Sequence, residues 1–293
     1  MVISFFKYRK IYYTISSFLI LLVFILLFSF GLNLGIDLKG GSMLEVEFLE
    51  NIPETKDIYQ KLLTEGFEGI IVQKAGEREF ILRFKEMSVK DYKKIIDSLT
   101  LFGSLNELQF EMVGPTISNE LREKSTMIIL LSVFLISFYV MFAFSSLSKI
   151  VPIFICSLIV LFTLFHDVML SLGVASILKI QISIPVIIAF LIIVGYSINN
   201  TVVVYDRFRD VMNNFPEKSL NQAIDEAISQ TLSRQINTSL TTLFPLITIF
   251  FFVDELKEFA LILMSGIIFG LYSSIFLALP LLGTFTSIFK KNN

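Results

Sequence analysis

The sequence predicts an α-helical polytopic membrane protein with six transmembrane helices and one inserted α+β domain. Its 293 residues are 54% hydrophobic with a mean hydropathy of +0.75, which is too apolar for an ordinary soluble domain. Six apolar runs are each long enough to cross the ~30 Å hydrocarbon core of a bilayer. Between the first and second runs, residues 35–124 alternate between strand-like and helix-like periodicity, as a folded domain outside the membrane would.

The apolar runs divide the chain into three parts. The predicted spans are Ile11–Phe30, Thr126–Phe144, Ile150–Leu172, Ile182–Tyr205, Ile236–Val253 and Phe259–Leu281. The first run follows a basic start, as in a secretory signal, but it is 20 residues long and lacks a small-residue cleavage site, so we interpret it as an uncleaved span. The parts are residues 1–34 with the first span, the inserted domain at 35–124 and a five-helix domain at 125–293.

The positions of lysine and arginine predict how the spans are oriented. Six spans place both termini on one side of the membrane, and most basic residues near the span ends lie on that side. They are Lys7, Arg9, Lys10, Lys149, Arg207, Arg209, Lys218, Arg234, Lys290 and Lys291, whereas the two short loops opposite hold only Lys179 and Lys257. We therefore expect both termini in the cytoplasm and the inserted domain outside.

The inserted domain reads as a β-α-β-β-α-β unit, the order of a ferredoxin-like fold. Its expected elements are strand 42–48, helix 55–67, strands 69–74 and 79–85, helix 88–101 and strand 105–113. The pairs Gly40-Gly41 and Gly114-Pro115 bracket the domain where it meets the membrane. A tight turn into the first strand explains the two glycines, which are too few for a phosphate-binding loop.

The loop at 206–234 is expected to contain an amphipathic helix that lies along the bilayer surface. Ser219 and Gln222 have the spacing of a capping box at its start. Farther along, Gly266, Gly270, Ser274 and Ala278 recur every four residues in the sixth span, which predicts close packing against another helix. The sequence leaves open whether that helix belongs to this chain or to a partner.

Several classes of function are excluded or disfavoured by what the chain lacks. It has one cysteine, Cys156, and one histidine, His166, so an intrachain disulfide and a multi-histidine metal site are excluded. No zinc-protease, nucleophile-triad or nucleotide-loop pattern is found, so we expect no enzyme activity, no cofactor and no metal. The formal charge of −2 argues against nucleic-acid binding.

Two groups of polar residues within apolar runs, and one arginine beside such a run, are candidate functional residues. Three roles fit Asp167, which lies beside His166 in the third span: part of a proton path, a hydrogen bond between helices, or contact with interfacial water. The last fits because Asp167 is expected near the outer face. Asn199 and Asn200 in the fourth span, with neighbouring hydroxyls, indicate either hydrogen bonding between helices or a polar cavity. Arg234, at the head of a polar half-span, fits a side chain that reaches the cytoplasmic interface.

Four motifs resemble the SecD/SecF family of protein-export membrane proteins, within the resistance-nodulation-division superfamily. They are Gly35–Gly41, Val113-Gly114-Pro115, His166-Asp167-Val168 and the stretch from Gly195 to Arg207, in which Gly195, Tyr196, Asn199, Asp206 and Arg207 match. They occur in the family's order and spacing across nearly the whole chain. The match is to the SecF branch of the family.

The resemblance implies a subunit that assists export of polypeptides across the bacterial cytoplasmic membrane by using the proton motive force. The implied partners are a SecD-like protein, the SecYEG channel, YajC, the unfolded secretory polypeptide and the lipid bilayer. It further implies a small periplasmic domain in which Gly40, Gly41, Gly114 and Pro115 act as a hinge. Arg234 matches an arginine implicated in proton-driven transport, and the resemblance implies that Asn200 and Arg234 face one polar region.

One departure from the family concerns Asn200, where an aspartate is usual. Asparagine is nearly isosteric with aspartate but does not ionise. Either a proton relay runs through a partner's carboxylate, or the protein couples differently. The alternative functions are half of a small-molecule or lipid exporter of the resistance-nodulation-division type, and an assembly scaffold without transport.

Overall fold

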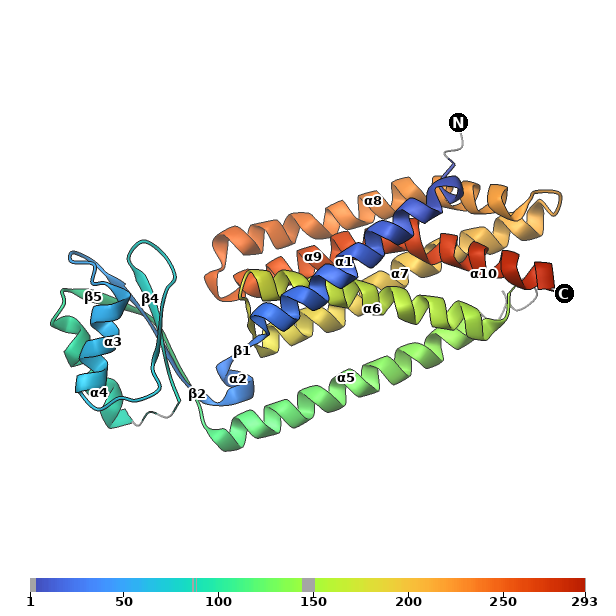
Figure 1. The fold of residues 1–293 in the computed structure, drawn as a ribbon. Coiled ribbons are helices and arrows are strands. Elements are labelled where there is room, and N and C mark those ends of the chain that lie inside the picture. The colour runs from blue at the N-terminus through green and yellow to red at the C-terminus, as the bar shows by residue number, and fades with distance from the viewer. Residues whose placement is uncertain (1–3, 86, 88, 144–150, 293) are drawn as a thin grey trace. The chain divides into compact units, whose positions relative to one another are not determined.

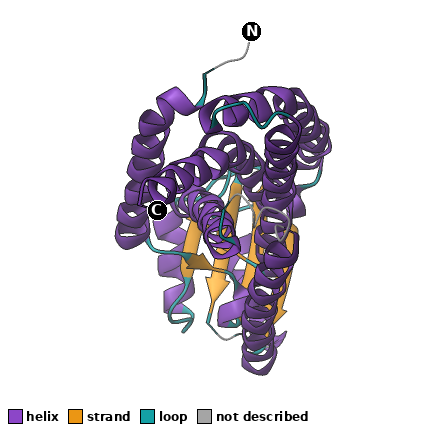
Figure 2. Cartoon of the chain, turned by 90° about the vertical axis from the view of Figure 1, so that its right-hand side faces the viewer, coloured by secondary structure: helices purple, strands orange, loops and turns teal. Residues whose placement is uncertain are grey.

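The computed structural model describes residues 4–85, 87, 89–143 and 151–292. The chain divides into two compact units, which we call the membrane unit (residues 1–33 and 127–293) and the inserted unit (residues 34–126). Helices dominate the first, and a four-stranded sheet lies in the second (Figures 1 and 2). Phe144, Ile150 and Lys149, which bound the second and third predicted spans, lie outside the described residues, as does Ser88 at the start of a predicted helix.

Six helical segments among the described residues are long and apolar enough to cross a membrane, as the sequence predicts. The elements are η1 (Phe6–Tyr8), α1 (Arg9–Phe30), α5 (Pro115–Ala143), α6 (Ile153–Ile177), α7 (Ile184–Asn214), α8 (Leu220–Phe252), η3 (Asp254–Leu256), α9 (Lys257–Ser273), η4 (Ser274–Ala278) and α10 (Leu279–Asn292). The short strands β1 (Asn33–Leu34) and β6 (Gln181–Ile182) pair with each other. The last span is composite, because α9, the single π-helical turn η4 and α10 follow one another without a break.

The core of the membrane unit lies where α7 packs against α6, α8 and α9. Tyr205 and Phe208 of α7 are its largest fully buried side chains, and the Tyr205 hydroxyl donates to the Ala278 carbonyl at 3.0 Å. That carbonyl belongs to the π-helical turn, where the ordinary helical hydrogen-bond ladder is displaced. The bond therefore ties α7 to the composite last span.

The helix predicted between the fourth and fifth spans is not a separate element, and its position at the bilayer surface stays a prediction. Helix α7 continues to Asn214, and α8 runs unbroken from Leu220 to Phe252. The capping box is present: the Ser219 hydroxyl accepts the Gln222 backbone N–H, and Gln222 accepts the Ser219 N–H at 3.0 Å. The apolar stripe of the segment packs into the protein core rather than against lipid; its members there are Ala223, Ile224, Ala227 and Ile228. No glycine or proline interrupts residues 220–234, so the helix propagates into the span.

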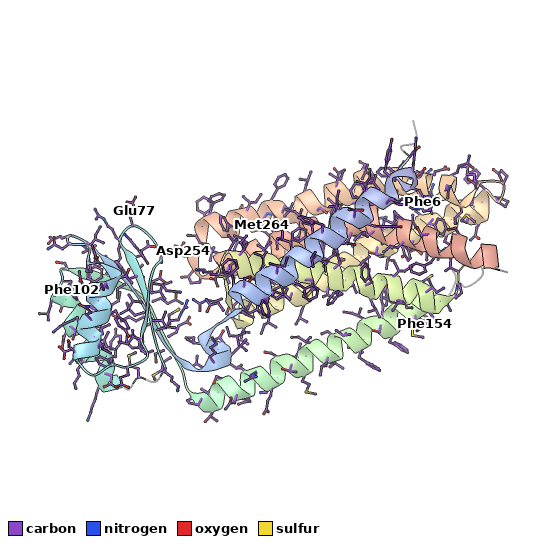
Figure 3. The ribbon with its side chains drawn as sticks, viewed as in Figure 1. Phe6, Glu77, Phe102, Phe154, Asp254 and Met264 are labelled. Atoms are coloured by element: carbon purple, nitrogen blue, oxygen red, sulfur yellow. The ribbon has the colours of Figure 1, made fainter. Side chains whose placement is uncertain are left out.

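The N-terminal segment is held against this extension of α8. Phe5 and Phe6 are buried in the core of the membrane unit, and the Phe6 N–H donates to the Asp225 carboxylate at 2.7 Å. Figure 3 shows Phe6 at the N-terminal end of α1, beside the other helices of the bundle. A carboxylate at the start of a helical segment satisfies N–H groups that have no intrahelical partner.

The inserted unit is a four-stranded antiparallel sheet packed against two helices. Its elements are α2 (Ile36–Lys39), β2 (Gly41–Phe48), α3 (Thr55–Thr64), β3 (Ile71–Lys74), β4 (Glu79–Phe84), α4 (Val89–Thr100) and β5 (Leu105–Val113). The strand order is β3-β4-β2-β5, with antiparallel pairing throughout. Alternate residues of β2 and β4 face α3 and α4; they include Leu44, Val46, Phe48, Phe80 and Leu82, all fully buried.

Local geometry explains the glycine pair at the start of β2. Gly40 ends α2 with φ +74°, and Gly41 begins β2 with φ +125°, a region that other residues rarely adopt. A Cβ on Gly41 would lie 2.5 Å from the Phe84 carbonyl oxygen, whereas a Cβ on Gly114 would have no atom within 4 Å. The tight turn therefore accounts for Gly40 and Gly41, and the hinge stays a prediction.

We predict that Gly41→Ala destabilises the protein and that Gly114→Ala does not. The alanine must adopt a left-handed conformation and displace a strand carbonyl, which together cost ~2–4 kcal/mol. The measurement is the thermal unfolding midpoint of the detergent-solubilised protein, with protease cleavage within residues 34–126 as the readout. The midpoints of the two variants are then compared. Wild-type stability of Gly41→Ala with impaired export would instead favour a hinge at this position.

Candidate functional site

A fully buried carboxyl group lies at the centre of the membrane unit. Asp167 of α6 is 0% exposed, and its Oδ2 accepts hydrogen bonds from Ser197 of α7 at 2.5 Å and Ser273 of α9 at 2.7 Å. Its Oδ1 lies 3.0 Å from Nδ1 of His166, which is also buried. Three helices thus converge on one carboxyl group, which we call the Asp167 cluster.

This burial contradicts the interpretation of Asp167 as a residue in contact with interfacial water. Helix α6 continues to Ile177, ten residues beyond Asp167, whereas the predicted span ended at Leu172. The face of α6 that carries Asp167 is covered by α7 and α9, because small side chains let these helices come close. Hydrogen bonding between helices is observed at this site, and the proton path stays a prediction.

The hydrogen-bond pattern constrains where the protons lie. A buried carboxylate is costly unless several donors satisfy it, and two hydroxyls and an imidazole are in place here. An ionised Asp167 accepts from all three, which puts the proton of a neutral His166 on Nδ1. The other nitrogen, Nε2, is buried and has no hydrogen-bond partner in the part of the chain that the structure describes. His166 therefore carries one satisfied and one unsatisfied nitrogen.

A second polar cluster lies beside the Asp167 cluster, because Ser274 directly follows Ser273 in the chain. Ser274 donates to Gln235 Oε1 at 2.6 Å, and Gln235 Nε2 donates to Thr231 at 3.3 Å. Sequence reasoning did not single out Ser197, Ser273 or Gln235. Spacing could have indicated these residues, because Ser197 lies three residues before Asn200 and Gln235 follows Arg234. Hydroxyl and amide residues in a membrane span are common helix-packing residues, however, so the spacing alone did not identify them.

Asn200 and Arg234 do not form a pair in this chain. Asn200 of α7 is 2% exposed, and its Nδ2 has no hydrogen-bond partner among the described residues. Arg234 is exposed on α8, while the next residue, Gln235, points into the bundle. Successive helical residues are 100° apart, so an inward Gln235 directs Arg234 toward the outside. Among the described residues no hydrogen bond joins Asn200 to Arg234, and the shared polar region that the resemblance implied stays a prediction.

Exposed polar residues form a stripe on the outer face of α8, which we call the α8 polar stripe. Its members are Arg234, Asn237 and Thr241, spaced at three and four residues and therefore on one face. On neighbouring α7, Gly195 and Asn199 are exposed as well. A polar face on a membrane-spanning helix is unfavourable in lipid, which indicates a protein surface that needs a partner.

Two of the other motif residues, Tyr196 and Arg207, join α7 to α8, and Asp206 forms an ion pair within α7. The Tyr196 hydroxyl donates to Ser239 at 3.1 Å. Farther along, the Arg207 Nε–H donates to Gln230, and Asp206 pairs with Arg209 at 3.1 Å. These contacts give the motif a structural role at the end where α7 leaves the span.

The small-residue ladder packs against α7 of the same chain, which answers the question left open by the sequence. A Cβ on Gly266 would lie 2.2 Å from the Ile193 side chain, and one on Gly270 would lie 3.3 Å from Ser197 Cβ. Ser274 follows on the same face and bonds Gln235. The glycines allow the close approach that brings Ser273 to Asp167.

Comparison with known proteins shows two family matches. The family described as "Protein export membrane protein SecD/SecF, C-terminal" matches residues 94–287, and the SecD/SecF GG motif matches residues 25–48. The chain is 35% identical over 288 residues to protein translocase subunit SecF of Helicobacter pylori strain J99, covering 94% of this chain and 85% of that one. It is 34% identical to SecF of Rickettsia bellii strain OSU 85-389, covering 97% and 93% of the two chains.

Solved structures show the same fold. The crystal structure of SecDF from Thermus thermophilus superposes with a TM-score of 0.84 at 29% identity over 100% of this chain. A structure of SecDF in a super-membrane-facing form gives a TM-score of 0.71 at 29% identity. The chain spans 39% of the length of the first of these structures.

We predict opposite effects of alanine at two helical glycines. Gly266→Ala should destabilise the protein by ~1–3 kcal/mol, because the methyl group overlaps a fully buried Ile193 with little room to move. Gly195→Ala should be neutral or stabilising by ~0.5–1 kcal/mol, because its Cβ would meet no atom within 4 Å in this chain. Thermal unfolding in detergent compares the two. Equal midpoints would contradict the close packing of α9 on α7.

Proposed function

The chain belongs to the SecD/SecF family as a SecF-type subunit of the Sec protein translocation machinery, and from this premise we propose that it assists polypeptide export by using the proton motive force together with a SecD-like partner. The observation that carries this proposal is similarity over the whole chain, from the Gly-Gly motif to the last span, to translocase subunits named SecF. The exporter alternative is not favoured, because these relatives are translocase subunits. The SecYEG channel, YajC and an unfolded secretory polypeptide are the further partners that we propose.

The SecD-like partner is supported by what this chain leaves uncovered. The solved relative is a SecDF chain, of which this chain matches 39%. The α8 polar stripe places Arg234 on the outside of a membrane-spanning helix, where a charged side chain that faces lipid is unfavourable. A partner helix with polar groups and a carboxylate opposite Arg234 would remove that cost. We therefore propose that the SecD-like chain covers this stripe.

In this proposal, the group that binds the proton and the group that contacts the partner are different residues. Asp167 is the one fully buried carboxylate among the described residues, so it is our candidate proton-binding group inside the subunit. Arg234 would hold a partner's carboxylate, and Asn200, which does not ionise, would only donate or accept hydrogen bonds. This division fits the separation of buried Asn200 from exposed Arg234.

We further propose that the protein lies in the bacterial cytoplasmic membrane with both termini in the cytoplasm. The inserted unit would then be a ferredoxin-like domain in the periplasm. The β-α-β-β-α-β order and the sheet order β3-β4-β2-β5 support the fold. The distribution of lysine and arginine supports the orientation.

The orientation is tested with reporter fusions. A periplasm-dependent reporter should be active when fused after Asn51, and a cytoplasm-dependent reporter should be active after Asn214, at the end of α7. The positive control is a fusion of the cytoplasmic reporter at the C-terminus. The reverse pattern would contradict the proposed topology.

The coupling proposal is tested at Arg234 and Asn200. Arg234→Ala should lower secretion of a reporter protein to the level that wild type shows with an uncoupler, because a partner carboxylate would lose its cation. Ser233→Ala, an exposed neighbour, is the matched control and should export normally. Asn200→Asp should be tolerated, because it restores the residue that the resemblance implies is usual at this position. Uncoupler-sensitive export at the wild-type rate in Arg234→Ala would refute the role of Arg234.

A further inference from the structure

A groove of about 540 Å³ lies within the membrane unit between α1, α6 and the composite last span. Its walls are almost entirely apolar and include the rings of Phe24 on α1 and of Phe162 and Phe165 on α6. All three rings are about half exposed, so the groove opens on the outer surface of the helices. In a membrane-spanning unit, such an apolar surface faces lipid chains or a partner helix.

The polar side chains along the groove are already hydrogen-bonded or buried. The Tyr13 hydroxyl lies 2.9 Å from Thr284 Oγ1, and the Ser16 hydroxyl lies 3.0 Å from the Tyr272 hydroxyl. His166, which also lines the groove, is fully buried. An ordered water needs two to four polar partners, and this lining leaves few of them. The groove therefore suits an apolar occupant.

The dimensions of the groove fit a lipid chain and not a helix. Its lining residues on α1 run from Tyr13 to Phe24, which is a rise of roughly 16 Å at ~1.5 Å per residue. That length is close to half of the ~30 Å hydrocarbon core, so the groove spans one leaflet. A helix about 10 Å wide would occupy more than ~1,000 Å³ over this length, which exceeds the volume of the groove. The occupant is therefore thinner than a helix, as an acyl chain is.

Positive charge lies one helical turn beyond the groove, at the N-terminal end of α1. Lys10 precedes Tyr13 by three residues and Ser17 by seven, which places all three on one face of the helix. Lys10 is exposed and forms no ion pair within the part of the chain that the structure describes. The guanidinium of the neighbouring Arg9 lies over the Phe6 ring, 4.1 Å from its centre, at the same end. Cations at this depth attract the phosphates of anionic headgroups.

We propose that this groove binds one acyl chain of an anionic phospholipid from the leaflet at the N-terminal end of α1, with the lipid phosphate held by Lys10. The apolar walls select the chain, and the lysine selects the charge of the headgroup. Only Ser16 and Val23 of α1 are buried, so the bound chain would extend a narrow interface between α1 and the rest of the bundle. The inference goes beyond the export function and does not depend on proton coupling.

The test uses tryptophan fluorescence, because the chain contains no tryptophan. Phe24→Trp places the reporter in the groove wall. Ile25→Trp is the matched control, because Ile25 is exposed at nearly the same depth and does not line the groove. Each full-length variant is reconstituted into phosphatidylethanolamine vesicles that contain a minor fraction of phosphatidylglycerol. The acyl chains of one lipid or the other carry bromine, which quenches tryptophan on contact.

We expect brominated phosphatidylglycerol to quench the Phe24→Trp variant about fivefold more than the Ile25→Trp variant, which is the enrichment that one lysine gives at an anionic surface. Brominated phosphatidylethanolamine should quench the Ile25→Trp variant more than the Phe24→Trp variant. Equal quenching of the two variants by each lipid would overturn the proposal. An unquenched Phe24→Trp variant would show a groove filled by protein and would overturn it as well.

The headgroup contact is tested in the Phe24→Trp background. Lys10→Gln should lower the quenching by brominated phosphatidylglycerol to the level of the Ile25→Trp variant. Lys179→Gln removes the same charge from an exposed lysine just after α6 and should leave the quenching unchanged. Excess quenching that survives Lys10→Gln would overturn the assignment of the phosphate to Lys10. None of these outcomes depends on whether export is coupled to protons.

Discussion

The arrangement of the membrane unit depends on the burial of one carboxyl group. Asp167 is fully buried. Its carboxyl group accepts hydrogen bonds from Ser197 of α7 and Ser273 of α9, and it lies within hydrogen-bond distance of His166 on its own helix, α6. Leaving a buried polar group without its hydrogen-bond partner costs ~1–3 kcal/mol, so these bonds constrain the relative position of α6, α7 and α9. A change in any of these hydrogen bonds would therefore alter the packing of three helices at once.

Glycine makes that convergence possible. Gly266 and Gly270 allow α9 to approach α7 so closely that added Cβ atoms would overlap Ile193 or touch Ser197. Ser273, the last residue of α9, bonds Asp167, and Ser274, the first residue of the π-helical turn, bonds Gln235. Close backbone packing and the polar clusters are therefore one feature, because hydroxyl side chains are too short to bond across a wider gap.

The two faces of helix α8 differ in how their polar side chains find hydrogen-bond or charge partners. Gln235 faces inward and completes a cluster, whereas Arg234 faces outward without a counter-charge among the described residues. The resemblance implies an aspartate where this chain has Asn200, so the buried position carries no charge, and Arg234 has no carboxylate partner among the described residues. In a SecF-type subunit this asymmetry agrees with a function that is completed by a SecD-like chain.

The sequence alone determined the class of the protein, its six spans, the succession of elements in the inserted unit and the family, because apolar length, periodicity and motif spacing are local properties. It also identified His166, Asp167 and the glycine ladder as unusual. Tertiary structure alone decided that Asp167 is enclosed, that the ladder packs on α7, that residues 206–214 and 220–234 extend two long helices, and that Asn200 is buried while Arg234 is exposed. These outcomes depend on which helix faces cover one another, and side-chain burial between distant segments is not encoded in the local pattern of either segment.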